Sequence, residues 1–177
     1  YSMVRPQSNQ ASLLAKLKVV QGGYPFYGKV ALKSGRDFSS VLKKGSIIVA
    51  PALLDRLKLD VGAQLHVGNA ILEISDVVLT EPDQPVNFFF LGPRIFISAD
   101  DLNRLDLLKK RSRVRYSYLI KVFDPSQIDA IAGRLRALAD EELEHVDTFR
   151  TARSGVKRFF DNLLFFLGLI GIFTLLL

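Results

Sequence analysis

The sequence predicts an α+β fold that leads into an apolar helix, and three features of its 177 residues support this. Short segments in which apolar and polar residues alternate are frequent in residues 1–108, as is typical of half-buried β-strands. Residues 109–158 have the pattern strand, helix, strand, which indicates a βαβ unit. Residues 159–177 end in a strongly apolar run. We therefore expect two folded lobes followed by a membrane-directed segment.

The N-terminal residues 1–45 are expected to begin with a β-hairpin. Residues 2–5 form a short strand-like piece that Pro6 stops. Residues 12–20 alternate, with Leu13, Ala15, Leu17 and Val19 on one face and Lys16 and Lys18 on the other, which favours a half-buried strand paired with the first. A break at Gly22-Gly23 and an aromatic turn precede a third strand at residues 29–33.

The middle of the chain, residues 46–108, is predicted to be β-rich with two short helices. Pro51 can open the first helix, because proline is tolerated at the first helical position. Gly68-Asn69 is a two-residue hairpin signal, and Ser98 with Asp101 forms a capping box for the second helix. The expected strands cover residues 46–49, 64–67, 70–77, 87–91 and 94–97, and the helices cover residues 52–57 and 98–107.

Residues 109–158 are expected to supply the βαβ unit. Residues 113–123 alternate apolar and mainly basic side chains, which predicts a long strand. Asp124 and Pro125 are a strong helix start, and apolar residues three and four apart predict one buried stripe as far as Leu143. Residues 145–149 then form the returning strand. We expect residues 151–161 to lead helically into the apolar run.

The run of residues 163–177 has no charged side chain, and Thr174 is its only polar one. As a helix it would span roughly 22 Å, short of the ~30 Å hydrocarbon core of a bilayer. Because the run is apolar on all sides and follows Lys157 and Arg158, we expect a transmembrane helix that is cut off at the end of this sequence. A buried core helix is the alternative.

The formal charge of +6 is compatible with nucleic acid or an anionic membrane as partner. We expect no nucleic-acid partner, because the dense basic run has neither aromatic-laced RNA-binding motifs nor zinc-finger spacing beside it. That run is instead predicted to be a solvated loop passing into a strand. Its members are Lys109, Lys110, Arg111, Arg113 and Arg115. The absence of cysteine excludes disulfides and thiolate metal sites.

Residues that could support catalysis are scarce. The sequence has no HExxH, GxSxG, GxGxxG or Walker A pattern, so we expect neither catalysis nor binding of ATP. His66 and His145 are expected to be surface or strand residues, and the acidic run is expected to be a solvated helix end. That run consists of Asp140, Glu141, Glu142 and Glu144. We therefore expect no catalytic, cofactor-binding or metal-binding residues and no cofactor, while residues that bind a substrate or partner cannot be assigned.

Several segments occur in an order that resembles a family of bacterial membrane proteins. They are SM-V-R, then YPFYG, then SIIVAPALLDRLKLDVGAQLHVG, then LGPRIFIS with DDL, then SRVRYSYLIKV. Together they resemble the FtsX-like ABC-transporter permeases with a MacB-type periplasmic core domain. The resemblance is greatest to the branch predicted to handle lipophilic compounds alongside a lysophospholipase-type esterase.

The resemblance implies a two-lobed periplasmic domain. Residues 1–45 and 109–158 would form a split α/β porter-like lobe, residues 46–108 a β-rich insert, and residues 159–177 the start of the transmembrane helix. Residues 1–158 would lie in the periplasm, and the protein in the inner membrane.

The resemblance also implies a function without catalysis. A permease of this kind would transmit ATP-driven conformational change across the inner membrane to extract or export lipids, lipoproteins or other hydrophobic compounds. Its expected partners are a separate cytoplasmic ABC ATPase, the lipid bilayer and a periplasmic esterase or other envelope protein. The alternative is a membrane-anchored regulatory domain that binds and activates a periplasmic hydrolase.

Overall fold

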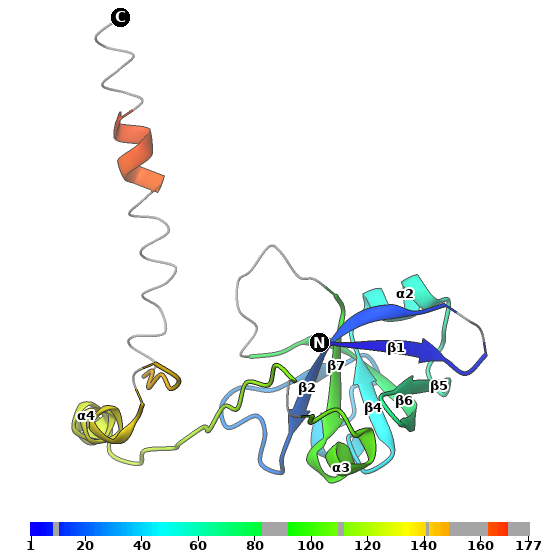
Figure 1. Cartoon of the computed structure of the whole chain (residues 1–177), viewed down its shortest axis with the longest axis horizontal. Helices are drawn as coiled ribbons and strands as arrows, with labels where there is room; N and C mark the ends of the chain where they lie inside the picture. Colours follow the sequence, from blue (N-terminus) through cyan, green and yellow to red (C-terminus); the bar gives the residue numbers. More distant parts are fainter. Residues whose placement is uncertain (9–10, 83–91, 110–111, 141, 149–162, 170–177) are drawn as a thin grey trace, which may run out of the picture. The chain divides into compact units, whose positions relative to one another are not determined.

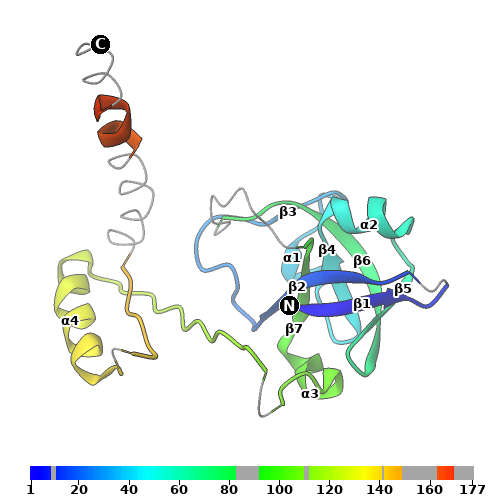
Figure 2. The ribbon, with the colours of Figure 1, turned by 45° about the horizontal axis from the view of Figure 1, so that its top comes forward.

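The computed structural model describes residues 1–8, 11–82, 92–109, 112–140, 142–148 and 163–169 (Figures 1 and 2). The chain divides into two compact units, Tyr1–Leu119 and Ile120–Leu177, which are described separately. Helices and strands both occur, so the fold is of the mixed α and β type that the sequence predicts.

Within the described residues, the first unit is built on one sheet with the strand order β3-β6-β4-β7-β2-β1-β5. Because β5 pairs with β6 as well as with β1, the sheet closes on itself. The β2–β7 and β4–β6 pairs are parallel and the other pairs are antiparallel. The strands are β1 (Ser2–Pro6), β2 (Leu13–Val20), β3 (Ala31–Leu32), β4 (Ser46–Val49), β5 (Gln64–Val67), β6 (Ala70–Thr80) and β7 (Arg94–Ser98).

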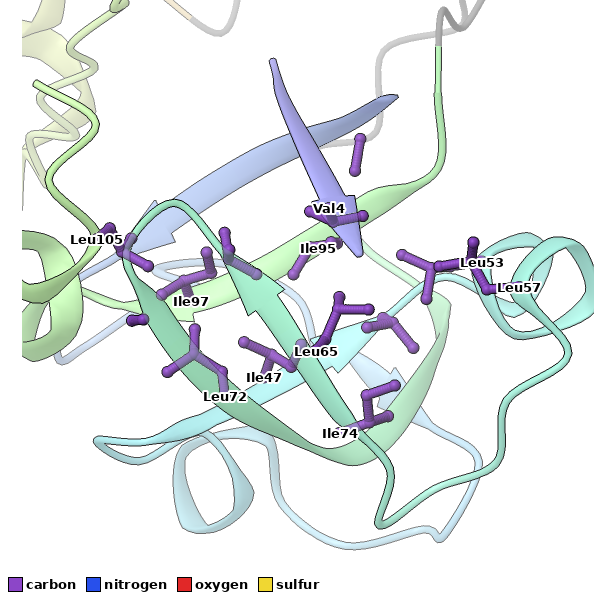
Figure 3. Close-up of a cluster of buried hydrophobic side chains, with 14 residues drawn as sticks. Val4, Ile47, Leu53, Leu57, Leu65, Leu72, Ile74, Ile95, Ile97 and Leu105 are labelled. Atoms are coloured by element: carbon purple, nitrogen blue, oxygen red, sulfur yellow. The ribbon is translucent and has the colours of Figure 1, made fainter. Parts of the chain in front are cut away.

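The main hydrophobic core fills the inside of this closed sheet (Figure 3). Side chains alternate along a strand, so every second residue points inward. Two short helices contribute at opposite ends of the cluster: α2 (Pro51–Leu57) provides Leu53 and Leu57, and α3 (Leu102–Leu105) provides Leu105. The strand residues in the cluster are Val4, Ala15, Ile47, Val49, Leu65, Val67, Ala70, Leu72, Ile74, Ile95 and Ile97.

A second hydrophobic cluster covers part of the outer face of the sheet. The segment from Tyr24 to Leu42, which includes β3 and α1 (Phe38–Val41), packs against the outward side chains of β4, β6 and β7. The rings of Phe38 and Phe96 meet edge to face with centroids 5.4 Å apart. Strands β4 and β7 are therefore buried on both faces, which explains their continuous apolar sequences.

The secondary structure of the first unit agrees closely with the sequence-based predictions. The hairpin of β1 and β2 is confirmed, with Met3 opposite Leu14, and Gly68-Asn69 joins β5 to β6 as predicted. Helix α2 begins at Pro51. The strand predicted at residues 87–91 lies within the stretch 83–91, which is outside the described residues.

The predicted capping box at Ser98 is only half formed. The Ser98 hydroxyl accepts a hydrogen bond from the Asp100 N–H. The Asp101 carboxylate instead accepts hydrogen bonds from the Gly45 N–H at 2.6 Å and from the Arg104 guanidinium at 2.7 Å. A 3₁₀ turn at Ala99–Asp101 therefore precedes α3, which ends at Leu105 instead of Leu107 because Asp106 adopts a left-handed conformation with φ 49°.

The strands of residues 1–45 pair differently from the expectation. They were expected to join residues 109–158 in one lobe, but β1 pairs with β5, and β2 pairs with β7. An alternating pattern identifies the buried face of a strand but does not determine which strand lies beside it in the sheet. The domain boundaries at residues 45, 108 and 158 stay predictions.

The helix of the predicted βαβ unit is present in the second unit, whereas the strands predicted before and after it are not formed in the described residues. A 3₁₀ turn, Pro125–Gln127, leads into α4 (Ile128–Leu138), and the Asp124 carboxylate caps it by accepting the Ser126 N–H. Residues 113–122 and 145–148 belong to no strand, so the predicted βαβ unit is not formed within the described residues. A strand needs a neighbour for its backbone hydrogen bonds, and no described strand pairs with either segment.

Helix α4 ends earlier than predicted, at Leu138 instead of Leu143. Side-chain carboxylates accept hydrogen bonds from the backbone just after the helix. The Asp140 N–H donates to the Glu144 carboxylate, and the Glu142 N–H donates to the Asp140 carboxylate. Such local bonds compete with the helical pattern and favour a turn.

The apolar run is described only in part. Residues 163–169 are helical and exposed, and residues 151–161 and 170–177 lie outside the described part of the chain. Within the described residues, none of the helices combines the length and the apolar character that crossing a membrane requires.

Candidate functional site

The outer face of β2 and β7 carries a cluster of charged and aromatic side chains in the first unit. Ala15 of β2 points into the core. Because successive side chains of a strand point to opposite faces, Lys16 and Lys18 point outward. The parallel pairing places Lys16 opposite Arg94 and Lys18 opposite Phe96. The face therefore brings two like charges side by side and sets a lysine over an aromatic ring.

Glu81, just after β6, is the carboxylate of this cluster. Its side chain is buried and forms ion pairs with Arg94 and with Lys18, the latter at 3.4 Å. The Lys18 ammonium also donates to the Tyr24 hydroxyl at 2.7 Å and lies 4.5 Å from the centroid of the Tyr24 ring. These contacts hold three strands and the turn before β3 together.

The surroundings of Lys16 and Arg94 on this face disfavour the charged forms of both side chains. Burial lowers the pKa of Lys16, and the positive charges of Arg94, Lys18 and Arg115 lower it further. Burial likewise lowers the pKa of Arg94, while Tyr24 and Tyr1 act in the opposite direction. The arrangement concentrates positive charge in a partly desolvated place.

A second polar network is built around Asp76, which is 3% exposed. Its carboxylate accepts hydrogen bonds from the Ser34 hydroxyl and from the Val77 N–H, the latter at 2.8 Å. Arg36 lies 3.4 Å from the same carboxylate. Burial alone would raise the pKa of Asp76, but the hydrogen bonds and Arg36 outweigh it and leave that pKa below its usual value. The network ties the turn after β3 to β6, so its role is structural.

Because the pKa of Asp76 is depressed in the folded protein, its ionised form stabilises the fold. This contribution is complete above the ordinary aspartate pKa of about 3.9 and is lost as the pH falls through the folded value. We expect Asp76→Asn to cost about 1–3 kcal/mol at pH 7 and to flatten the acid-induced loss of stability. Urea unfolding at pH 7 and at acidic pH, followed by circular dichroism, measures both. An unchanged acid dependence in the variant would contradict the assignment.

The two histidines belong to different compact units. His66 lies on β5, half-buried, with Arg5 and Ile71 opposite it on the neighbouring strands. His145 is exposed, and its Nδ1 lies 3.0 Å from the Glu144 carbonyl oxygen. Within the part of the chain that the structure describes, no three His, Asp or Glu side chains are grouped so that they could hold a metal ion.

The predicted acidic run follows α4, and the basic run begins near α3. Asp140 and Glu144 bind backbone N–H groups beyond α4, and Glu141 lies outside the described residues. Lys109 forms an exposed ion pair with Asp106 at 3.4 Å. Lys110 and Arg111 lie outside the described residues. Arg113 and Arg115 are exposed and belong to no strand, so for the described members of the run the loop part of the prediction is confirmed and the strand part is wrong.

Sequence reasoning missed the cluster on β2 and β7. The alternation of residues 12–20 already placed Lys16 and Lys18 on one outward face. Nothing in the sequence showed that Arg94 and Glu81, far along the chain, would lie beside them, because that depends on the parallel pairing of β2 with β7.

Comparison with known proteins supports the resemblance at a coarse level. The chain is 32% identical over 105 residues to YbbP, an uncharacterised ABC transporter permease of Escherichia coli K12. This similarity supports the permease family. The matched residues are 59% of this chain and 13% of YbbP, so the chain corresponds to a small part of that relative's length. No protein-family model matches the sequence.

Among solved structures, a domain of a candidate permease protein from Porphyromonas gingivalis is similar. The two share 15% sequence identity with a TM-score of 0.45, over 81% of this chain and 68% of that domain. A TM-score at this level does not establish a common fold.

Proposed function

We propose that this chain is the extracytoplasmic part of an ABC-transporter permease subunit. The observation that carries the proposal is the 32% identity with YbbP over 105 residues. The closed sheet, with its core fully enclosed, supports a rigid body that passes on movement. In this proposal the chain itself does no chemistry, and a separate cytoplasmic ABC ATPase hydrolyses ATP.

The substrate and the direction of transport belong to the same proposal. The segments that resemble FtsX-like permeases with a MacB-type core suggest extraction or export of lipids, lipoproteins or other hydrophobic compounds. They also suggest an inner-membrane location with residues 1–158 in the periplasm and a periplasmic esterase as a further partner. The apolar, uncharged residues 163–177 support entry into the bilayer at that point.

The test uses the membrane protein that carries this chain, purified from its native membranes. We expect an ABC ATPase to copurify with it. If movement passes rigidly between residues 109–148 and the apolar run, two glycines inserted after Ser154 should abolish transport-dependent phenotypes and leave basal ATPase activity intact. Glycine in a helix costs about 1 kcal/mol and creates a bend or hinge.

The matched control inserts two glycines after Gly22, in an exposed turn where a Cβ added to that residue would meet no atom within 4 Å beyond its chain neighbours. This variant should transport normally. Absence of any ATPase in the purified complex would overturn the permease proposal. Full transport by the Ser154 insertion variant would overturn rigid coupling alone.

A further inference from the structure

We propose that the outer face of β2 and β7 binds a phosphate-bearing anion, with Lys16 as its central ligand. Lys16, Lys18, Arg94 and Arg115 supply the positive charge. The site is independent of the permease proposal, and its ligand is either free phosphate or the phosphate of a lipid headgroup.

The register of β2 and β7 brings like charges together. Lys16 and Arg94 stand directly opposite one another in the parallel pair, and like charges in this relation destabilise a sheet. Lys18 is the next outward residue on the same strand. The positive charges of Lys18 and Arg115 also lower the pKa of Lys16 and so add to the repulsion. An anion between the cations would turn this repulsion into attraction.

The cations of this face are unequally paired with carboxylates. Glu81 is buried and forms ion pairs with Arg94 and Lys18. Within the described residues, neither Lys16 nor Arg115 forms a salt bridge with a carboxylate. Two cations are thus left to face a ligand, while Glu81 and Tyr24 hold Lys18 in place.

The chemistry of these cations favours a phosphate as the ligand. Ammonium and guanidinium groups form their strongest hydrogen bonds with phosphate and carboxylate oxygens. Lys16 is half-buried, and a partly desolvated ammonium interacts more strongly with a charged ligand than one in open water. A phosphate has several oxygens and can therefore accept hydrogen bonds from more than one cation at once.

The experiment uses the 177-residue chain and two probes. Inorganic phosphate is titrated by calorimetry, and vesicles of phosphatidylcholine with or without phosphatidylglycerol are cosedimented with the protein. Phosphatidylcholine alone gives the baseline for binding through the apolar residues 163–177. The variants are K16Q and R115Q, and K43Q is the matched control, since Lys43 is exposed on another part of the unit and its loss changes the net charge equally.

We expect K16Q to weaken binding of the anion about tenfold, as the loss of one charge-assisted hydrogen bond implies, and R115Q to weaken it less. K43Q should bind as the unchanged chain does. K16Q should also unfold at a temperature no lower than the unchanged chain, because it removes a like-charge pair. R115Q, in an exposed position outside any strand, keeps the test decisive if K16Q misfolds.

The results separate the two sources of phosphate. Binding of inorganic phosphate that depends on Lys16 assigns the site to the free ion. Lys16-dependent binding confined to vesicles with phosphatidylglycerol assigns it to a lipid headgroup. Equal weakening by K16Q and K43Q would show attraction by net charge only and overturn the proposal, as would the absence of binding to both probes.

Discussion

Gly68→Ala is expected to destabilise the first unit by about 2–4 kcal/mol. Gly68 has a φ of 57°, and an alanine there costs about 1 kcal/mol in the left-handed conformation. Its Cβ would also overlap the carbonyl oxygen of Leu105. That carbonyl cannot simply withdraw, because it accepts the Asn69 N–H at 3.0 Å, and a forced shift of packed backbone costs a further ~1–3 kcal/mol.

Gly35→Ala is the matched control for this prediction. Gly35 also has a positive φ, 73°, but no atom lies within 4 Å of the position that a Cβ would take. We expect only the conformational cost of about 1 kcal/mol there. Thermal and urea unfolding followed by circular dichroism measure both variants. Equal destabilisation of the two would show that contact with Leu105 contributes nothing.

Leu72→Ala is expected to cost about 2–5 kcal/mol, because it empties space inside the closed sheet. Leu72 on β6 is fully buried in the cluster drawn in Figure 3. The cluster to which Leu72 belongs also contains residues of β4, β5 and β7, so the packed strands must move if the cavity is to collapse.

The preceding residue provides the comparison. Ile71 lies on the same strand, points to the outer face and is 40% exposed. Ile71→Ala should therefore cost less than about 1 kcal/mol, since most of the removed surface already contacts water. Urea midpoints of the two variants, measured under one condition, give the difference. A cost for Ile71→Ala as large as that for Leu72→Ala would contradict the assignment of inside and outside on β6.

Much of the first unit could be predicted from local patterns. The alternation in residues 12–20 identified β2 and its inward face, and Pro51 and Gly68-Asn69 located a helix start and a hairpin. These signals are local, because they depend on side-chain direction and on the backbone preferences of proline and glycine. The same reasoning predicted strands at residues 113–122 and 145–148 that the structure does not have, because alternation alone does not supply the neighbouring strand that backbone pairing requires.

The candidate anion site shows the same limit. Lys16 and Lys18 could be placed on an outward face from the sequence, whereas the roles of Arg94 and Glu81 could not. Both come from parts of the chain that were expected in a different lobe from β2. Only the pairing of β2 with β7 brings them within reach.

The sequence by itself determined the α and β character of this protein, the direction of side chains along its strands, the lack of motifs for catalysis and the apolar run at residues 163–177. The tertiary structure decided which strands are neighbours, and therefore that the sheet closes on itself through β5 and β6. The physical reason is that side-chain periodicity is set by the geometry of the local backbone, whereas strand order is set by backbone hydrogen bonds and burial between distant segments.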